Sequence, residues 1–317
     1  MIRAAVIGVG QFGREHARVY ADSADAQLVS VCDINEMASR RVAEQFGSAY
    51  CADYRELIGK VDAVSLAAPT SAHAEIACAL LAAGVHVLVE KPIARTLDEA
   101  DAMTRAAQSS GAVLQVGHLE RFNPAVMAAK RIVTAPRFFE AHRLSLFTPR
   151  SLDVDVVMDL MIHDIDVVLS LVGSPVREAR AAGIPILTPR IDIANARVEF
   201  ENGCVANLTA SRVSLEKVRK LRFFQPHEYV SIDYAAQEAA TVSVKPDDDG
   251  RMTFDARLLP VERGETLRLE IEAFLAAVRG GELRVSATEG RRALALARDI
   301  VARIREHAER AGVPFAG

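Results

Sequence analysis

The sequence predicts an α/β protein with two domains: a doubly wound parallel sheet first, then an α+β domain built on an open, mostly antiparallel sheet. Three observations carry this prediction. Strand and helix patterns alternate over the first 120 residues, a glycine-rich turn follows the first strand, and extended runs separated by turn residues dominate after about Phe122. We place the boundary between residues 1–121 and 122–317, with C-terminal helices that could pack back on the first domain.

The elements expected in the first domain are short apolar strands, typical of a sheet buried on both faces. We expect strands at Ile2–Gly8, Gln27–Asp33, Asp62–Ala67, His86–Glu90 and Val113–Gly117. Helices are expected between them at Gln11–Ala21, Glu36–Phe46, Ala72–Ala83 and Leu97–Ser110. Connections of this length between parallel strands form right-handed crossovers.

The second domain has a different order of elements. Helices are expected at Pro124–Ile132, Asp155–Gly173, Leu267–Arg279 and Gly290–Ala311. Extended runs are expected at Arg137–Phe147, Val176–Ala182, Ile191–Phe200, Cys204–Ser211, Val218–Phe224, Tyr229–Tyr234 and Ala240–Lys245. Turns such as Glu201-Asn202-Gly203 indicate hairpins. A broad open sheet commonly buries one face under helices and the other against a second subunit, so we expect a homodimer or homotetramer.

Composition limits the class of protein. The 317 residues are 50% hydrophobic and 25% charged with a net charge of -4, which argues against nucleic acid or a membrane surface as partner. The cysteines Cys32, Cys51, Cys78 and Cys204 are scattered, without metal-ligand spacing to each other or to histidines. We therefore expect reduced thiols in a cytoplasmic protein and no metal site. No signal peptide or membrane span is expected.

The glycine-rich turn indicates a dinucleotide site. The G-x-G-x-x-G string Gly8–Gly13 follows a strand, opens a helix, and is followed 20 residues after Gly13 by Asp33. Gly8 allows the tight turn, Gly10 lets the backbone approach a pyrophosphate, and Gly13 allows close packing of the helix on the sheet. Asp33 would bind the ribose hydroxyls and repel a 2'-phosphate, which favours NAD over NADP.

Two arginines and two further loops also bear on the expected cofactor site. Arg40 and Arg41 could receive a 2'-phosphate, but inside a helix we interpret them as solvated. Loops at the carboxyl ends of two later strands, Ala68–His73 and Glu90–Pro92, lie where open parallel sheets bind ligands. The residues expected to contact the cofactor are Gly8, Gly10, Gln11, Phe12, Gly13, Asp33, Pro69, Thr70, His73, Glu90 and Lys91.

Lys91 is the chemically notable residue of these loops. A lysine at the end of a buried strand, beside the positive charge of an oxidised nicotinamide, can exchange protons near neutrality. The alternative is a surface ion pair between Glu90 and Lys91.

The predicted helix Asp155–Gly173 is apolar on nearly every side, yet it carries an ionisable stripe. At about 100° per residue the stripe comprises Asp155, Asp159, His163, Asp166 and Ser170, while Asp164 points the other way. Such a stripe loses hydration unless it faces a partner or a cleft, which makes His163 a functional-site candidate. The alternative is a core network in which Asp159 simply bonds His163.

Five segments together resemble the Gfo/Idh/MocA oxidoreductase family: GVGQFG, Asp33, PTSAHAEIACALLAAGVHVLVEKP, VGHLERFNP and DLMIHDID. The resemblance implies that Lys91 of the EKP motif and His163 flank the reacting carbon, with Asp159 supporting them. It also implies a cis peptide between Lys91 and Pro92. One departure is Met161, where family members often have glycine.

The expected reaction is NAD-dependent oxidation of a secondary hydroxyl by hydride transfer. His163 would be the general base with its tautomer set by Asp159, and Lys91 would bond the same oxygen; the two roles could be exchanged. The expected substrate-binding residues are Lys91, His118, Arg121, Asn123, Asp159 and His163.

The GHLERFNP and DLMIHDID segments resemble the branch of this family that oxidises the 3-hydroxyl of UDP-N-acetylglucosamine on a route to lipid A. A diphosphate needs cations, although any one of them is more often a solvated charge. Candidates are Arg121, Arg143, Arg150, Arg212 and the run Lys217–Arg222. Two alternatives are a free polyol or aldose (inositol-type) dehydrogenase and a non-catalytic NAD(H)-binding regulatory protein. The presence of Lys91, Asp159 and His163 weighs against the second.

Overall fold

A computed structural model describes residues 1–148, 154–246 and 249–312. The chain forms two compact units. The first unit contains Met1–Leu119 and Glu265–Leu294, and the second contains Glu120–Gly264 and the residues from Ala295 onward. The chain therefore returns to the first unit near its end, and helix α8 (Ala287–Ala311) begins in that unit and continues in the second.

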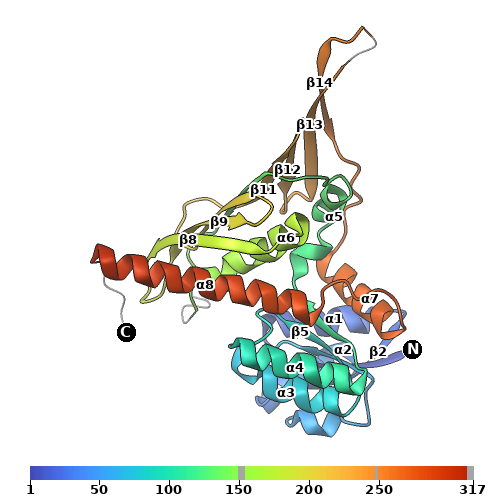
Figure 1. Cartoon of the computed structure of the whole chain (residues 1–317). Helices are drawn as coiled ribbons and strands as arrows, with labels where there is room; N and C mark the ends of the chain where they lie inside the picture. The colour runs from blue at the N-terminus through green and yellow to red at the C-terminus, as the bar shows by residue number, and fades with distance from the viewer. Residues whose placement is uncertain (149–153, 247–248, 313–317) are drawn as a thin grey trace. The chain divides into compact units, whose positions relative to one another are not determined.

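The first unit is built on a six-stranded parallel sheet with the order β3-β2-β1-β4-β5-β6. Helices α3 and α4 cover one face, and α1, α2 and α7 cover the other (Figure 1). The strands are β1 (Ile2–Ile7), β2 (Ala26–Cys32), β3 (Ala49–Cys51), β4 (Ala63–Leu66), β5 (His86–Glu90) and β6 (Leu114–Gly117). The helices are α1 (Gln11–Ala21), α2 (Glu36–Phe46), the 3-10 turn η1 (Tyr54–Leu57), α3 (Thr70–Ala82), α4 (Leu97–Ser110) and α7 (Thr266–Val278).

Local signals in the sequence fix the helix ends of this unit. Asn35 accepts the Ala38 N–H at the start of α2, and Thr96 and Glu99 form a reciprocal capping box at the start of α4. Helix α7 joins the core formed by β1 and α1 through buried Leu267, Ile271, Phe274 and Leu275. Burying these four side chains stabilises the late segment within the first unit by about 1.5–3 kcal/mol per side chain.

The second unit is built on an eight-stranded sheet with the order β14-β13-β12-β11-β7-β10-β9-β8. The β7–β10 pair is parallel, and the other six neighbouring pairs are antiparallel. The strands are β7 (Phe138–Leu144), β8 (Val176–Ile184), β9 (Ile193–Phe200), β10 (Val205–Ser211), β11 (Val218–Gln225), β12 (Glu228–Asp233), β13 (Glu238–Pro246) and β14 (Met252–Leu258). The fold class predicted from the sequence is confirmed.

One face of this sheet is covered by helices (Figure 1). Helix α5 (Pro124–Lys130), which follows the 3-10 turn η2 (Leu119–Phe122), packs on β12 and β13. A π-helical turn, η3 (Val157–Met161), and α6 (Ile162–Val172) pack on β10, and α6 also packs on β7. Strand β7 alternates between fully buried and half-exposed side chains, so its second face is not covered within the unit.

A buried ion-pair network joins α6 to the sheet. The Arg143 guanidinium on β7 donates to both carboxylate oxygens of Asp164 at 2.7 and 3.0 Å, and to Glu120 at 3.0 Å. It also lies over the ring of Tyr234, 4.9 Å from its centroid. Burial alone would lower the pKa of Arg143, but the charges of Asp164 and Glu120 raise it. Arg143 therefore stays charged and compensates two carboxylates.

Some elements of the structure were not predicted from the sequence. These are β3, β14 and the π-helical turn: β3 has only three residues and β14 is exposed at six of its seven residues, so neither shows a local apolar period, and the turn shares its apolar residues with the helix it opens. The four cysteines are free thiols. Within the described ranges, no helix combines the length and the apolar character needed to cross a bilayer.

Replacing Arg143 by Met should destabilise the protein by about 3–5 kcal/mol, because it leaves Glu120 and Asp164 buried without their cation. Urea unfolding of the purified variant measures this loss. Arg180→Met is the matched control, since Arg180 pairs with Glu178 on the exposed surface and its loss should leave the urea midpoint unchanged. Equal midpoints for Arg143→Met and the native protein would contradict the role given to this network.

Candidate functional site

Of the three glycines in the glycine-rich turn, only Gly10 faces open space that a ligand could fill. Gly8 has φ +85°, and a Cβ there would lie 2.6 Å from the Ala67 backbone. A Cβ on Gly13 would overlap the carbonyl oxygen of Gly8. A Cβ on Gly10 would meet no atom within 4 Å. The packing of the fold therefore requires glycine at positions 8 and 13. At Gly10 it does not, and the open space there is available to a bound group.

Helix α1 begins at this turn without a side-chain cap. Gly10 is the N-cap residue and supplies no side-chain cap, and the first turn holds no acid. The exposed N–H groups and the partial positive charge of this end suit a pyrophosphate. Phe12, which was predicted to contact the cofactor, is 39% exposed and packs edge-on against His16. Gln11 is the exposed first residue of the helix.

Asp33 organises the same turn. Its Oδ2 accepts the Val9 N–H at 2.8 Å and its Oδ1 accepts the Asn35 N–H at 2.8 Å. The carboxylate thus holds the glycine-rich turn to the end of β2, next to the exposed start of α1. The donor set of this unit therefore fits a dinucleotide: Gly10 and the α1 N-terminus would hold its phosphates, and Asp33 its ribose.

The two loops predicted to complete the cofactor site are tied together by His73. Its Nε2 lies 2.8 Å from the Ala68 carbonyl oxygen, and its Nδ1 lies 3.1 Å from that of Pro92. The side chain is buried, which lowers the pKa of His73 although the carbonyl groups oppose the shift. Pro69 is the N-cap residue of α3 and Thr70 its first residue. His73 therefore shapes the loops from beneath rather than from an exposed surface.

Lys91 follows β5 directly and is half-buried. The predicted cis peptide between Lys91 and Pro92 is confirmed. Glu90, the last residue of β5, bonds His16 of α1, with its Oε1 3.1 Å from the imidazole Nε2. The Glu90 carboxylate is therefore mostly buried and hydrogen-bonded to His16, and the ion pair between Glu90 and Lys91 stays a prediction.

In the second unit, the ionisable stripe divides into two groups. Asp159 lies in the π-helical turn and His163 in the first turn of α6; both are half-buried and four residues apart, so they are neighbours on the helix surface. Single π-helical turns inside helices are frequent at functional sites. The other acids stabilise the unit: Asp166 pairs with Arg121 at 3.4 Å, and Asp155 accepts the Ile191 N–H at 3.1 Å.

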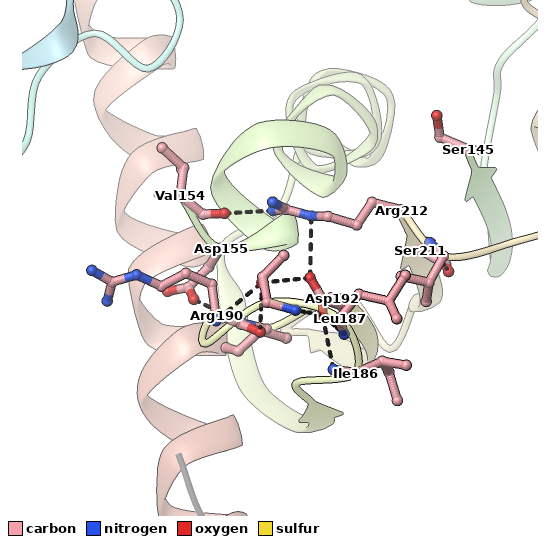
Figure 2. Close-up of polar contacts among 12 residues, drawn as sticks. Ser145, Val154, Asp155, Ile186, Leu187, Arg190, Asp192, Ser211 and Arg212 are labelled. Atoms are coloured by element: carbon pink, nitrogen blue, oxygen red, sulfur yellow. Dashed lines mark hydrogen bonds and ion pairs between the residues drawn. The ribbon is translucent and has the colours of Figure 1, made fainter. Parts of the chain in front are cut away.

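Figure 2 shows the polar cluster that fixes the start of this helix. The buried carboxylate of Asp192 accepts the backbone N–H groups of Ile186, Leu187 and Thr188 and the Thr188 hydroxyl. Burial alone would raise the pKa of Asp192, but these hydrogen bonds outweigh it and the pKa is lowered. The Arg212 guanidinium lies 3.7 Å from Asp192 and donates to the Val154 carbonyl at 2.5 Å.

This cluster holds residues 154–156 to the loop before β9. The Val156 N–H also donates to the Ile191 carbonyl at 2.9 Å, opposite the bond from Ile191 to Asp155. Asp159 and His163 follow directly along the chain. The cluster of Asp192 and Arg212 therefore sets where the helix that carries them begins.

Three of the predicted cations serve internal pairs. Arg121, Arg143 and Arg212 are almost fully buried beside Asp166, Asp164 and Asp192 respectively. Arg150 lies outside the described residues. Asn123 is also used internally: its amide donates to the Tyr234 carbonyl at 3.0 Å and its oxygen caps α5. His118 is buried just after β6.

The structure brings the predicted cofactor residues together in the first unit, with Lys91 and His118 in the same unit. Arg121, Asn123, Asp159 and His163 belong to the second unit. His16, Asp192 and Glu270 also shape the two units, and the sequence alone did not predict this. For His16, the available signal was its position inside the helix that follows the glycine-rich turn.

Comparison with known proteins assigns the family. Residues 2–118 match the oxidoreductase family with an NAD-binding Rossmann fold, Gfo/Idh/MocA, and residues 133–224 match the Gfo/Idh/MocA C-terminal domain. The chain belongs to the Gfo/Idh/MocA oxidoreductase family. Its first unit is thus a nicotinamide-binding unit, and the protein is a dehydrogenase.

Among its relatives in this family is UDP-N-acetylglucosamine 3-dehydrogenase from Acidithiobacillus ferrooxidans, 44% identical over 234 residues, which are 74% of each chain. A solved structure of UDP-N-acetylglucosamine 3-dehydrogenase from that organism superimposes with a TM-score of 0.90 at 37% identity, covering 96% of this chain and 98% of that one. The NAD(+)-dependent scyllo-inositol 2-dehydrogenase of Bacillus subtilis is 28% identical over 232 residues, 67% of this chain and 68% of the relative.

Gly10 and Gly13 should respond differently to replacement. Gly10→Val should leave the thermal midpoint nearly unchanged, because a Cβ at this position meets no protein atom within 4 Å. It should weaken NAD binding at least about tenfold, because it fills the approach to the pyrophosphate. Gly13→Val should instead lower the thermal midpoint, because it overlaps the Gly8 carbonyl. Differential scanning fluorimetry with and without NAD separates the two effects; tight NAD binding by Gly10→Val would contradict the assignment.

Proposed function

We propose that the protein uses NAD to oxidise the 3-hydroxyl of UDP-N-acetylglucosamine or of a related nucleotide sugar. The observation that carries this proposal is the 44% identity to a UDP-N-acetylglucosamine 3-dehydrogenase, together with Lys91, Asp159 and His163 at the positions that the family motifs give them. The 0.90 TM-score over nearly the whole of both chains supports it as well.

In the proposed reaction, Gly10, the α1 N-terminus and Asp33 would hold NAD, which would supply the hydride acceptor for the carbon that carries the hydroxyl. His163 removes the hydroxyl proton, and Asp159, one helical turn away, holds the imidazole in the required tautomer. Lys91 donates a hydrogen bond to the same oxygen and stabilises its developing negative charge. The roles of Lys91 and His163 could be exchanged without changing the proton balance.

The preference for NAD over NADP is part of the proposal. Asp33 at the end of β2 would bind two ribose hydroxyls and repel a 2'-phosphate. The nearby Arg40 is occupied by Glu36 at 3.0 Å and by the Tyr50 hydroxyl at 2.8 Å, and it lies over the Tyr50 ring. It is therefore not poised to receive a phosphate.

Arg219 is the cation we assign to the substrate diphosphate. It lies opposite Arg143 on the helix-covered face of the sheet, and both its burial and the charge of Arg143 lower its pKa. Among the residues that the structure describes, no carboxylate pairs with Arg219, whereas Lys220 and Arg222 of the same strand face Asp233 and Glu140. The charges of Glu120 and Asp164 raise the pKa of Arg219, but both carboxylates bond Arg143, so a bound anion would stabilise this half-buried cation further.

A free polyol is the second candidate substrate, favoured by the similarity to the scyllo-inositol dehydrogenase. Its lower identity, and the position of Arg219, make it the weaker candidate. We also propose that the half-exposed face of the eight-stranded sheet packs against a second copy, giving a homodimer or homotetramer. The setting we propose is the cytoplasm, where the product would feed an amino-sugar route to lipid A.

Lys91→Met and, separately, His163→Asn should each lower kcat by about 10²-fold or more, because each removes a group that handles the hydroxyl proton or its charge. NAD binding should persist in both. Turnover is measured by NADH absorbance with a panel of UDP-sugars and polyols, and a coupled aminotransferase draws the ketone forward. Full activity in either variant would remove that residue from the mechanism.

Arg219→Gln should raise KM for the UDP-sugar about tenfold while kcat and KM for NAD change little, because a lost phosphate contact weakens ground-state binding. Arg222→Gln, on the same strand but paired with Glu140, is the control and should leave KM unchanged. Preference for a free polyol, with no effect of Arg219→Gln, would instead support the inositol-type activity.

A further inference from the structure

We propose that two copies of this chain join through their β14 strands, which pair antiparallel about a two-fold axis at Ala256. The contact lies wholly inside the second unit. Combined with the packing of the sheet face proposed above, edge pairing gives a tetramer rather than a dimer. Only the step to a tetramer rests on that proposed packing. The β14 contact involves neither cofactor nor substrate, so it stands or falls separately from the proposed reaction.

Strand β14 is an edge of the eight-stranded sheet. It is the last strand in the sheet order and pairs with β13 along one side. The ribbon formed by β13 and β14 extends beyond α5, which covers the neighbouring strands (Figure 1). Six of the seven residues of β14 are exposed, and the exposed fraction reaches 82% for Phe254 and 69% for Leu258. An edge strand presents backbone donors and acceptors along its outer side, here beside apolar side chains, which makes it a template for a further strand.

The two faces of β14 differ in character. In its register with β13, Asp255 pairs with Ser243, and Arg257 pairs with Thr241. Ser243 and Thr241 are buried, and α5 packs on their strand, so the two charges lie on the helix-covered face of the sheet. The alternating residues of β14 lie on the uncovered face: Phe254, Ala256 and Leu258. One face of β14 thus carries a carboxylate and a guanidinium, and the other face is apolar.

Antiparallel pairing of two β14 strands about Ala256 is self-complementary. It places Asp255 opposite Arg257 of the second copy, and the symmetry repeats this pair on the other side of the axis. On the uncovered face it places Phe254 opposite Leu258 of the second copy, again twice. Opposite charges, and apolar side chains, that face each other directly across two strands stabilise the pairing. Both faces of the strand therefore match in the same register.

The neighbouring registers fail on one face or the other. A shift by one residue brings the apolar face of one strand against the charged face of its partner, for example with Phe254 opposite Arg257. A shift by two residues keeps the faces but places like charges together, Asp255 opposite Asp255 or Arg257 opposite Arg257. The distribution of charge along β14 thus selects one arrangement, and it favours a second copy of this chain over an unrelated strand as the partner.

An apolar row on the uncovered face ends at the proposed axis. It crosses the sheet from β7 to β14 through residues paired in register: Phe138, Phe224, Tyr229, Val242 and Ala256. The ring centroids of Phe138 and Phe224 lie 5.8 Å apart, and those of Phe224 and Tyr229 lie 5.2 Å apart. Pairing at Ala256 joins the two sheets edge to edge, so the row continues from one copy into the other. The edge contact thereby extends the surface proposed to pack against a further copy.

The opposite edge of the sheet is less suited to pairing. Strand β8 contains a β-bulge between Val176 and Glu178, and its side chains Arg177, Glu178 and Arg180 are exposed. Bulges and charged side chains keep edge strands from pairing with other chains. Over its described length, β14 keeps one regular register with β13 and contains neither proline nor lysine. Of the two edges, β14 is therefore the one shaped to receive a second copy.

Charge reversal tests the pairing, because both charges lie on the helix-covered face and leave the uncovered face of the sheet unchanged. Asp255→Arg and, separately, Arg257→Asp should each raise the dissociation constant of the edge contact by about tenfold or more, since both symmetry-related pairs become repulsive at once. The two changes combined should restore the dissociation constant to within about threefold of its native value, because the paired charges are exchanged. Sedimentation velocity over a dilution series of the full-length protein measures this constant.

Asp299→Arg is the matched control. The Asp299 carboxylate lies 3.4 Å from Arg303 on α8, and its side chain is 41% exposed, as is that of Asp255 beside Arg257. This change should leave dissociation unaltered. If the native contact dissociates only below measurable concentrations, cross-linking replaces sedimentation. Copper phenanthroline should then link two copies of Ala256→Cys through the introduced thiols, Asp255→Arg should suppress the link, and adding Arg257→Asp should restore it.

The outcomes separate the β14 contact from the other proposals. An oligomer that both single reversals dissociate and the double reversal reassembles supports pairing through β14. An oligomer that the single reversals leave intact overturns the β14 contact, while packing through the sheet face stands. Failure of the double reversal to restore assembly also overturns the contact, and a native protein that is monomeric at every concentration overturns both interfaces. NADH formation by the native protein, measured in parallel, tests the proposed reaction independently of these masses.

Discussion

Charge buried on an apolar helix must find a partner, and this requirement organises the second unit. Helix α6 is buried along most of its length, yet it carries Asp164 and Asp166. Arg143 and Arg121 compensate these acids, and the resulting pairs attach the helix to the sheet and to η2. The cluster of Asp192 and Arg212 fixes the chain just before the helix. Asp159 and His163 are thereby held on a segment that is anchored before and behind them.

In the first unit, the corresponding constraint is close approach of backbones. Gly8 and Gly13 are required by the packing of the turn against Ala67 and against itself, while Gly10 faces open space. Asp33 and His73 then fix the turn and the two loops from beneath through backbone groups. Backbone contacts of this kind make the turn and the loops rigid, which preorganises a binding site. The exposed start of α1 lies next to this turn and carries no side-chain cap.

The buried ion pairs of the second unit change the interpretation of its arginines. A count of cations near the expected site favours a diphosphate substrate, but Arg121, Arg143 and Arg212 prove to be structural, because each is buried against an acid. Arg219 differs in being half-buried without an ion pair of its own, since the carboxylates of Glu120 and Asp164, whose charges act on it, bond Arg143. Among the cations, the proposed contact with the substrate diphosphate thus depends on Arg219 rather than on a general surplus of arginines.

The sequence by itself determined the fold class, nearly all helices and strands, the glycine-rich turn, the acid that follows it, and the four-residue spacing of Asp159 and His163 on one helix. Such features are local: period, capping and spacing are written in neighbouring residues. Tertiary structure alone decided that Glu90 bonds His16, that Glu270 lies beside them from 180 residues away, and that three arginines are internal. The partner of a buried charge depends on which distant elements pack beside it, and no local pattern records that choice.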